Sequence, residues 1–158
     1  MGVKMKQESG RSMIEMLGVL AIMGVITVGA IAMISTAMRT QKHNTTNDDV
    51  AQIVLGVRQL LGEYDDFSNI DNSTIFGAIG MSNKNPYGGT YTVSVNQSNT
   101  RQFVVGIEGL SQSDCEYLVT KAWTDSVGYI TSNHTESGAT GNCRNTGSNN
   151  SVQIIFGD

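Results

Sequence analysis

The chain has 158 residues, which is enough for one domain or for a small domain with an appendage. Only 15% of the residues are charged and the net charge is −4, which argues against nucleic acid as a partner, because phosphate-backbone binding needs clustered Lys and Arg. The two cysteines, Cys115 and Cys143, would form one disulfide in an exported protein and would be free thiols in a cytosolic one. The N-terminus, which determines the compartment, decides between these states.

The first element in chain order is an uncharged apolar run at residues 16–38, which follows a short basic segment. As a helix this run would be about 34 Å long, enough to cross a hydrocarbon core of about 30 Å. Lys4, Lys6 and Arg11 lie upstream and favour a cytoplasmic N-terminus, although two basic residues downstream weaken that prediction.

Three interpretations of this run compete. A cleaved signal peptide could end near Ser35-Thr36-Ala37, but the apolar core of such a peptide is usually about 7–15 residues long, and Glu15 stands at the start of this run. A plain single-pass membrane anchor is the second interpretation. The third follows from residues 10–15, where a basic leader ends in Gly10, four residues intervene, and the carboxylate of Glu15 precedes the apolar run.

This arrangement resembles the class III signal of type IV pilins and pseudopilins. The resemblance implies that a membrane peptidase cuts after Gly10 on the cytoplasmic side and that the apolar helix stays on the mature protein. It also implies that Glu15, the fifth mature residue, pairs during assembly with the amino terminus of Arg11 on a neighbouring subunit. The chain departs from the family pattern at Arg11, where the family usually has an N-methylated apolar residue. It also has glycines rather than a proline in the run.

A second helical pattern follows at residues 48–64. Its apolar residues recur at i, i+3, i+4 and i+7, and they are Val50, Ile53, Val54, Val57, Leu60, Leu61 and Tyr64. Such an apolar face must pack against something. Because there is no proline between Arg39 and Asp49, we predict that the helix is continuous and forms a stalk over residues 11–64.

The rest of the chain predicts turns, strands and one short helix. Residues 65–85 are rich in Asn, Ser, Asp and Gly and predict a connecting loop with a short apolar patch at Ile75-Phe76. After the turn cluster at 85–89, alternating apolar residues predict a β-hairpin with strands near 91–95 and 103–107.

Ser113 and Glu116 resemble a capping box, which predicts a helix that starts there. The apolar face of this helix would carry Cys115, Leu118, Val119 and Ala122. Two further segments, 127–131 and 152–156, are strand candidates, and the residues between them are mostly polar around Cys143.

This order of elements resembles the type IVb pilins, the group that contains bundle-forming, toxin-coregulated and thin conjugative pilins. The shared features are an Asn-Pro-aromatic-Gly-Gly turn before a hairpin, a short helix with a cysteine, and a second cysteine near the C-terminus. The resemblance implies an α+β fold in three parts. These are a removed leader at 1–10, a stalk helix at 11–64, and a head at 65–158 with an antiparallel sheet and a loop closed by Cys115 and Cys143.

No pattern of residues predicts catalysis or a metal site. His43 and His134 lie in separate polar segments without neighbours at metal-ligand spacing. Asp65, Asp66 and Asp71 do not follow the EF-hand pattern for calcium. We therefore expect no enzymatic activity, no metal and no cofactor.

The expected function is structural. The resemblance implies a prepilin held in the bacterial inner membrane, processed by prepilin peptidase, and polymerised with copies of itself by a pilus assembly machinery into an extracellular filament. A minor pilin or type II secretion pseudopilin is one alternative, and a membrane-anchored or secreted enzyme or binding domain is another. Nothing in the sequence distinguishes adhesion, conjugation, DNA uptake and motility.

Overall fold

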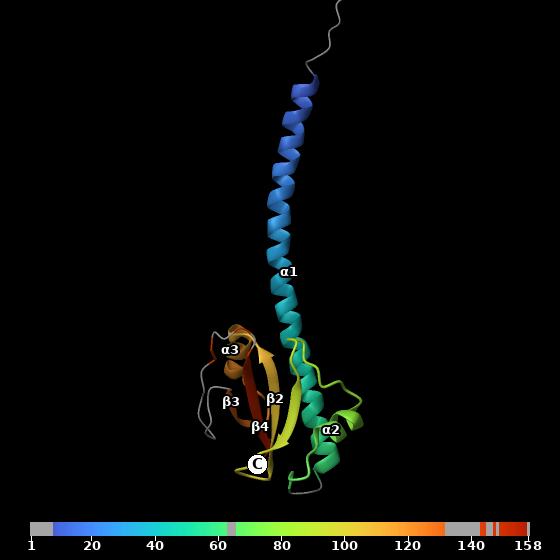
Figure 1. The fold of residues 1–158 in the computed structure, drawn as a ribbon, viewed down its shortest axis with the longest axis vertical. Helices are drawn as coiled ribbons and strands as arrows, with labels where there is room; N and C mark the ends of the chain where they lie inside the picture. Colours follow the sequence, from blue (N-terminus) through green and yellow to red (C-terminus); the bar gives the residue numbers. More distant parts are fainter. Residues whose placement is uncertain (1–7, 63–65, 132–142, 145–146, 148, 158) are drawn as a thin grey trace, which may run out of the picture. The chain divides into compact units, whose positions relative to one another are not determined.

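The computed structural model describes residues 8–62, 66–131, 143–144, 147 and 149–157 (Figure 1). Its helices are α1 (Glu8–Leu61), α2 (Asn72–Ile79) and α3 (Gln112–Thr120). Its strands are β1 (Tyr91–Val95), β2 (Gln102–Leu110), β3 (Ser126–Thr131) and β4 (Asn150–Gly157), and they form one antiparallel sheet. The expected α+β class, with a long N-terminal helix and a small antiparallel sheet, is confirmed. The chain divides into two compact units, residues 1–43 and 44–158.

The first unit is helical from Glu8 onwards, and every side chain from Ser12 to Gln41 is exposed. The hydroxyl groups of Thr27, Ser35 and Thr36, which lie in the apolar run, bond to the helix itself. Thr27 donates to the carbonyl of Met23 at 2.7 Å, and Thr36 donates to the carbonyl of Ala32 at 3.2 Å. A hydroxyl without a partner is costly in an apolar environment. These internal bonds therefore make the run compatible with a medium that offers no hydrogen bonds.

The second unit is built around the sheet, in the order β1-β2-β4-β3. The last strand in the sequence, β4, lies between β2 and β3. Phe103 pairs with Phe156 and Val105 pairs with Ile154 across β2 and β4. Since residues that are directly opposite share a face, these pairs make one face of the sheet apolar.

Helices cover this apolar face. Residues from the last part of α1 and from α3 belong to the same buried cluster as the strands, namely Val50, Ile53, Val54, Val57, Cys115 and Leu118. Helix α1 also approaches α2 closely, because a Cβ atom on Gly56 would collide with the side chain of Ile79. Leu60, which the sequence pattern placed on the apolar face, is 43% exposed, and Tyr64 lies outside the described residues.

Helix α2 corrects the prediction of a loop over residues 65–85. Asp71 caps its start by accepting the backbone N–H of Thr74 at 3.0 Å, and Gly80 ends it with φ of 66°. The apolar patch at Ile75 and Phe76 is the buried side of this helix. The segment has the Asn, Ser and Gly content that is typical of a loop, but its two caps stabilise a helix there.

Helix α3 starts one residue before the predicted capping box. Its cap is Ser111, whose Oγ accepts the backbone N–H of Asp114 at 3.2 Å, while Ser113 lies inside the first turn. The helix ends at Thr120, so Ala122 is not part of its apolar face. The spacing Ser-x-x-Glu was therefore misleading, because Ser-x-x-Asp two residues earlier supplies the cap. The strands predicted near 91–95, 103–107, 127–131 and 152–156 are all present, and three of them are longer than predicted.

Candidate assembly surface

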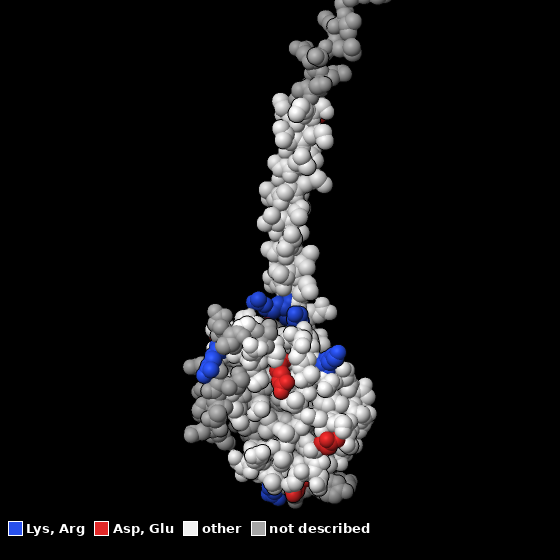
Figure 2. Space-filling model, in the orientation of Figure 1, with Lys and Arg blue, Asp and Glu red and all other residues white. Residues whose placement is uncertain are grey.

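The most unusual surface of the protein is the first part of α1. Large apolar side chains between residues 13 and 38 are 55% to 76% exposed and lie on all sides of the helix. They are Met13, Ile14, Met16, Leu17, Val19, Leu20, Ile22, Met23, Val25, Ile26, Val28, Ile31, Met33, Ile34 and Met38. Figure 2 shows this part of the helix without charged residues over the run 16–38.

A helix that is apolar all round is normally buried in a core or in a membrane. By length and composition, this helix is able to cross a membrane. The apolar surface therefore needs a cover, which lipid or other copies of the chain would provide.

The residues predicted to control processing and assembly lie at the start of α1. Gly10 and Arg11 are within the helix, and Glu15 is exposed one residue before the apolar run. Cleavage after Gly10 and pairing between Glu15 and a neighbouring Arg11 stay predictions, because both concern molecules other than this single chain. His43 is also on α1, whereas His134 and Asp65 lie outside the described residues. Among the described residues, no group of three His, Cys, Asp or Glu side chains could hold a metal ion.

The Asn-Pro-Tyr-Gly-Gly turn is organised by one buried side chain, Asn85. Its Oδ1 accepts the backbone N–H groups of Tyr87 and Gly89, each at 3.0 Å. Its Nδ2 donates to the carbonyl of Glu108 at 2.7 Å and to that of Thr90 at 3.2 Å. Asn85 therefore ties the turn to the end of β2, which explains physically why Asn suits this position.

The turn and β1 bring two tyrosines to the part of α1 that lies in the second unit. The Tyr91 hydroxyl donates to Asp49 Oδ2 at 2.8 Å, and Thr46 in the same part of α1 is fully buried. Burial raises the pKa of Tyr87 to about 12, and burial also raises the pKa of Tyr91. Both phenols therefore stay protonated at neutral pH, and that of Tyr91 donates to Asp49.

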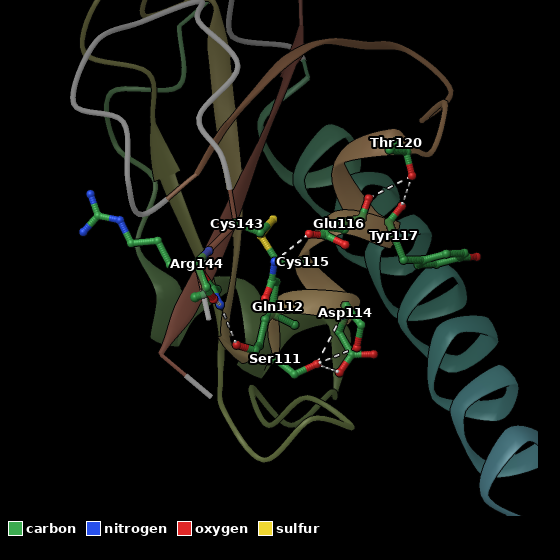
Figure 3. The surroundings of a disulfide bond; sticks show 12 residues. Ser111, Gln112, Asp114, Cys115, Glu116, Tyr117, Thr120, Cys143 and Arg144 are labelled. Atoms are coloured by element: carbon green, nitrogen blue, oxygen red, sulfur yellow. Dashed lines mark hydrogen bonds between the residues drawn. A yellow bond between two sulfur atoms is a disulfide. The ribbon is translucent and has the colours of Figure 1, made fainter. Parts of the chain in front are cut away.

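The disulfide joins Cys115 on α3 to Cys143, with Cα atoms 5.8 Å apart (Figure 3). Cys115 is fully buried, and the disulfide joins two cysteines that are 28 positions apart in the sequence. Asn150, the first residue of β4, is also buried and bonds to both N–H and carbonyl of Arg144, next to Cys143. Sequence reasoning predicted the disulfide but missed Asn150, because nothing distinguishes this residue within an Asn- and Ser-rich stretch.

Comparison with known proteins adds independent evidence. No protein-family model matches the chain. The sequence is similar to the toxin coregulated pilin of Vibrio cholerae serotype O1, with 25% identity over an alignment of 128 residues that covers 72% of this chain. The chain is related to a type IVb pilin. The match spans 57% of the length of that pilin.

The fold of this chain agrees with its relationship to a pilin. The long N-terminal helix, the small antiparallel sheet and the C-terminal disulfide fit an α+β pilin fold. The features by which the sequence resembles type IVb pilins lie at defined places in this fold. The Asn85 turn precedes β1, Cys115 lies on α3, and Cys143 precedes β4.

Proposed function

We propose that this protein is a structural subunit of a type IV pilus, made as a membrane-anchored precursor and polymerised into an extracellular filament. The observation that carries the proposal is the exposed apolar surface on the first part of α1, combined with the relationship to a pilin. Lipid would cover this surface before assembly, and the same helix of neighbouring subunits would cover it in the filament. A helix suits both states because it satisfies its backbone groups internally.

The proposed maturation step is cleavage between Gly10 and Arg11 by a prepilin peptidase at the cytoplasmic side of the inner membrane. It removes residues 1–10 and leaves a free amino group on Arg11, four residues before Glu15. The helix is too apolar to leave the membrane by itself, so a pilus assembly machinery would extract it. In the filament, the Glu15 carboxylate would pair with the amino terminus of a neighbouring subunit, because an unpaired buried charge costs several kcal/mol.

In this proposal the partners are other copies of the chain, the peptidase, the assembly machinery and the inner membrane. The role is structural rather than enzymatic, as the relationship to a pilin suggests. The filament would present residues 44–158 at its surface, since the buried core of this unit needs no further cover.

Replacing Glu15 with Val tests the proposal. The substitution lengthens the apolar run and leaves Gly10 and Arg11 in place, so insertion and cleavage should continue. Sheared surface filaments should fall to a few per cent of the wild-type yield or less, while processed protein accumulates in the membrane fraction. Glu15→Gln should be intermediate, because it keeps hydrogen bonding and loses the charge. The measurement combines filament yield after shearing with the intact mass of the membrane-bound protein.

Glu8→Val is the matched control, because it makes the same substitution inside the proposed leader. Cleavage after Gly10 removes this position, so mature Glu8→Val protein should have the wild-type mass and form filaments at the wild-type yield. Wild-type filament yield from Glu15→Val would contradict the pairing role. A mature chain that keeps residues 1–10 would contradict the processing step. A chain that occurs only in traces in filaments built mainly from another subunit would instead be a minor pilin.

A further inference from the structure

Asn150 bonds to both chain segments that carry the cysteines. Its Oδ1 accepts the N–H of Arg144 at 2.9 Å, and its Nδ2 donates to the carbonyl of Arg144 at 2.8 Å. The same Nδ2 also donates to the carbonyl of Leu110 at 3.4 Å. Arg144 directly follows Cys143, and Leu110 directly precedes the cap of the helix that carries Cys115. A single side chain therefore bridges the two segments that the disulfide joins.

The environment of Asn150 makes these bonds significant. Its side chain is 1% exposed, and its partner across the sheet is Leu110, at the end of β2. When a buried hydrogen bond is broken, its donor and acceptor have no water to bond to. The loss of free energy is therefore larger than for the same bond at the surface. Helix α3 connects Leu110 to Cys115. Ser111 caps this helix, and the carbonyl of Ser111 accepts the N–H of Cys115 at 3.0 Å.

We propose that Asn150 is a positioning residue for disulfide formation, which holds Arg144, and with it Cys143, beside Cys115 before the sulfur atoms are joined. Closing a long loop costs conformational entropy, and the hydrogen bonds of Asn150 offset part of this cost while both thiols are still reduced. The disulfide and Asn150 then stabilise each other, because each holds the same segment against β4.

The reaction is an ordinary thiol–disulfide exchange. A thiolate of one cysteine attacks a small disulfide such as glutathione disulfide and releases one reduced glutathione. The second thiolate then attacks this mixed disulfide, closes the Cys115–Cys143 bond and releases a second reduced glutathione. The protein loses two electrons and two protons, and glutathione disulfide takes up both. Asn150 acts in the second step, in which the two cysteines must meet.

The test measures the effective concentration of the two thiols in the folded full-length protein in detergent. The protein is equilibrated with mixtures of reduced and oxidised glutathione, the thiols are trapped by alkylation, and the oxidised fraction is read by mass. Asn150→Ala should lower the effective concentration about tenfold, because it removes all three hydrogen bonds of the side chain. Asn149→Ala, at the exposed neighbouring position, should leave it within twofold of wild type.

A second control separates positioning from general stability. Val152→Ala removes a fully buried methyl pair from the same strand, so it should lower the unfolding midpoint without changing the effective concentration. An Asn150→Ala value within twofold of wild type would overturn the proposal. An equal decrease in Val152→Ala would also overturn it, because the effect would then belong to the stability of β4.

Hydrogen exchange provides a measurement in which Asn150 itself is unchanged. Asn150 Oδ1 accepts the Arg144 amide in the disulfide-bonded structure, and the proposal requires this bond to form also without the disulfide. In the Cys115→Ser/Cys143→Ser protein, the Arg144 amide should therefore be protected. Exchange at the rate of an unstructured peptide would show that Asn150 does not hold this segment in the absence of the disulfide, and would refute the proposal.

Discussion

The two compact units use similar residues in opposite ways. Both contain part of α1 and both parts are rich in branched apolar side chains. In the first unit Ile26 is 65% exposed, whereas in the second unit Ile53 is fully buried against the sheet. Apolar composition alone therefore does not define a core. The second unit covers the apolar face of its part of α1 with its own strands, whereas the apolar side chains of the first unit are exposed.

The charges of the two units follow the same division. Residues 44–158 contain twelve acidic and five basic residues, whereas residues 1–43 contain two acidic and five basic ones. A net charge far from zero keeps a surface soluble and resists association of like surfaces. In the proposed filament, attraction between copies would therefore come from the apolar run rather than from the acidic second unit.

The largest expected effect comes from the two isoleucines that define this comparison. Ile53→Ala should lower the free energy of unfolding by about 4 kcal/mol, because it removes buried methyl groups and leaves a cavity. Ile26→Ala, the matched change on the exposed part of the same helix, should change it by less than about 0.5 kcal/mol. Denaturant unfolding of the full chain in detergent, followed through the signal of Trp123, measures both. Equal effects would mean that the two parts of α1 are not different in packing.

A smaller effect should come from Asn85, whose contacts lie entirely in the second unit. Asn85→Ala removes four hydrogen bonds and leaves backbone groups of the turn and of Glu108 without their partner. The expected loss is about 2–3 kcal/mol in the free energy of unfolding. The exposed Asn44 provides the control, and Asn44→Ala should stay within about 0.5 kcal/mol of wild type in the same unfolding assay. Wild-type stability of Asn85→Ala would show that the turn forms without this side chain.

The smallest expected effect is a pH dependence at the start of α2. The hydroxyl of Ser73 and the backbone N–H of Thr74 bond to the Asp71 carboxylate and lower its pKa from the ordinary value of 3.8. Because the folded-state pKa is depressed, this contribution to stability is present above about pH 3.8 and is lost as the pH falls through the folded-state value.

The variant Asp71→Asn keeps an oxygen that can cap the helix but does not titrate. Its thermal midpoint should therefore fall less steeply than that of wild type over the acid range below about pH 4. Thermal unfolding of both proteins at a series of acid pH values checks this. Identical slopes would show that Asp71 does not contribute to the acid sensitivity.

Much of the fold follows from periodicity in the sequence. The uncharged run predicted the first part of α1, and alternation predicted the two strands of the hairpin, because buried faces impose these patterns. The segments of β3 and β4 were named as strand candidates. Helix α2 could not be predicted in this way. It is only two turns long, and its stability depends on the caps at Asp71 and Gly80 and on packing against Gly56, which is distant in the sequence.

The polar positions were harder to predict than the apolar ones. The Asn85 turn stood out because Pro and two glycines follow it, but Asn150 lies among several similar residues in a polar stretch. Its role depends on three partners, two on Arg144 and one on Leu110, and the last is 40 positions away. The cap at Ser111 was missed because two overlapping Ser-x-x-acid patterns compete, and only the path of the chain selects one.

The central place of β4 has a consequence for how the protein is made. The strand that completes the sheet, β4, follows the other three strands in the sequence, so it is synthesised after them. Until it arrives, β2 and β3 have no common neighbour, and both expose edges on which other chains can add. The sheet of the second unit is therefore complete only after β4 has been synthesised, and this non-local pairing slows folding and leaves edges open in the interval.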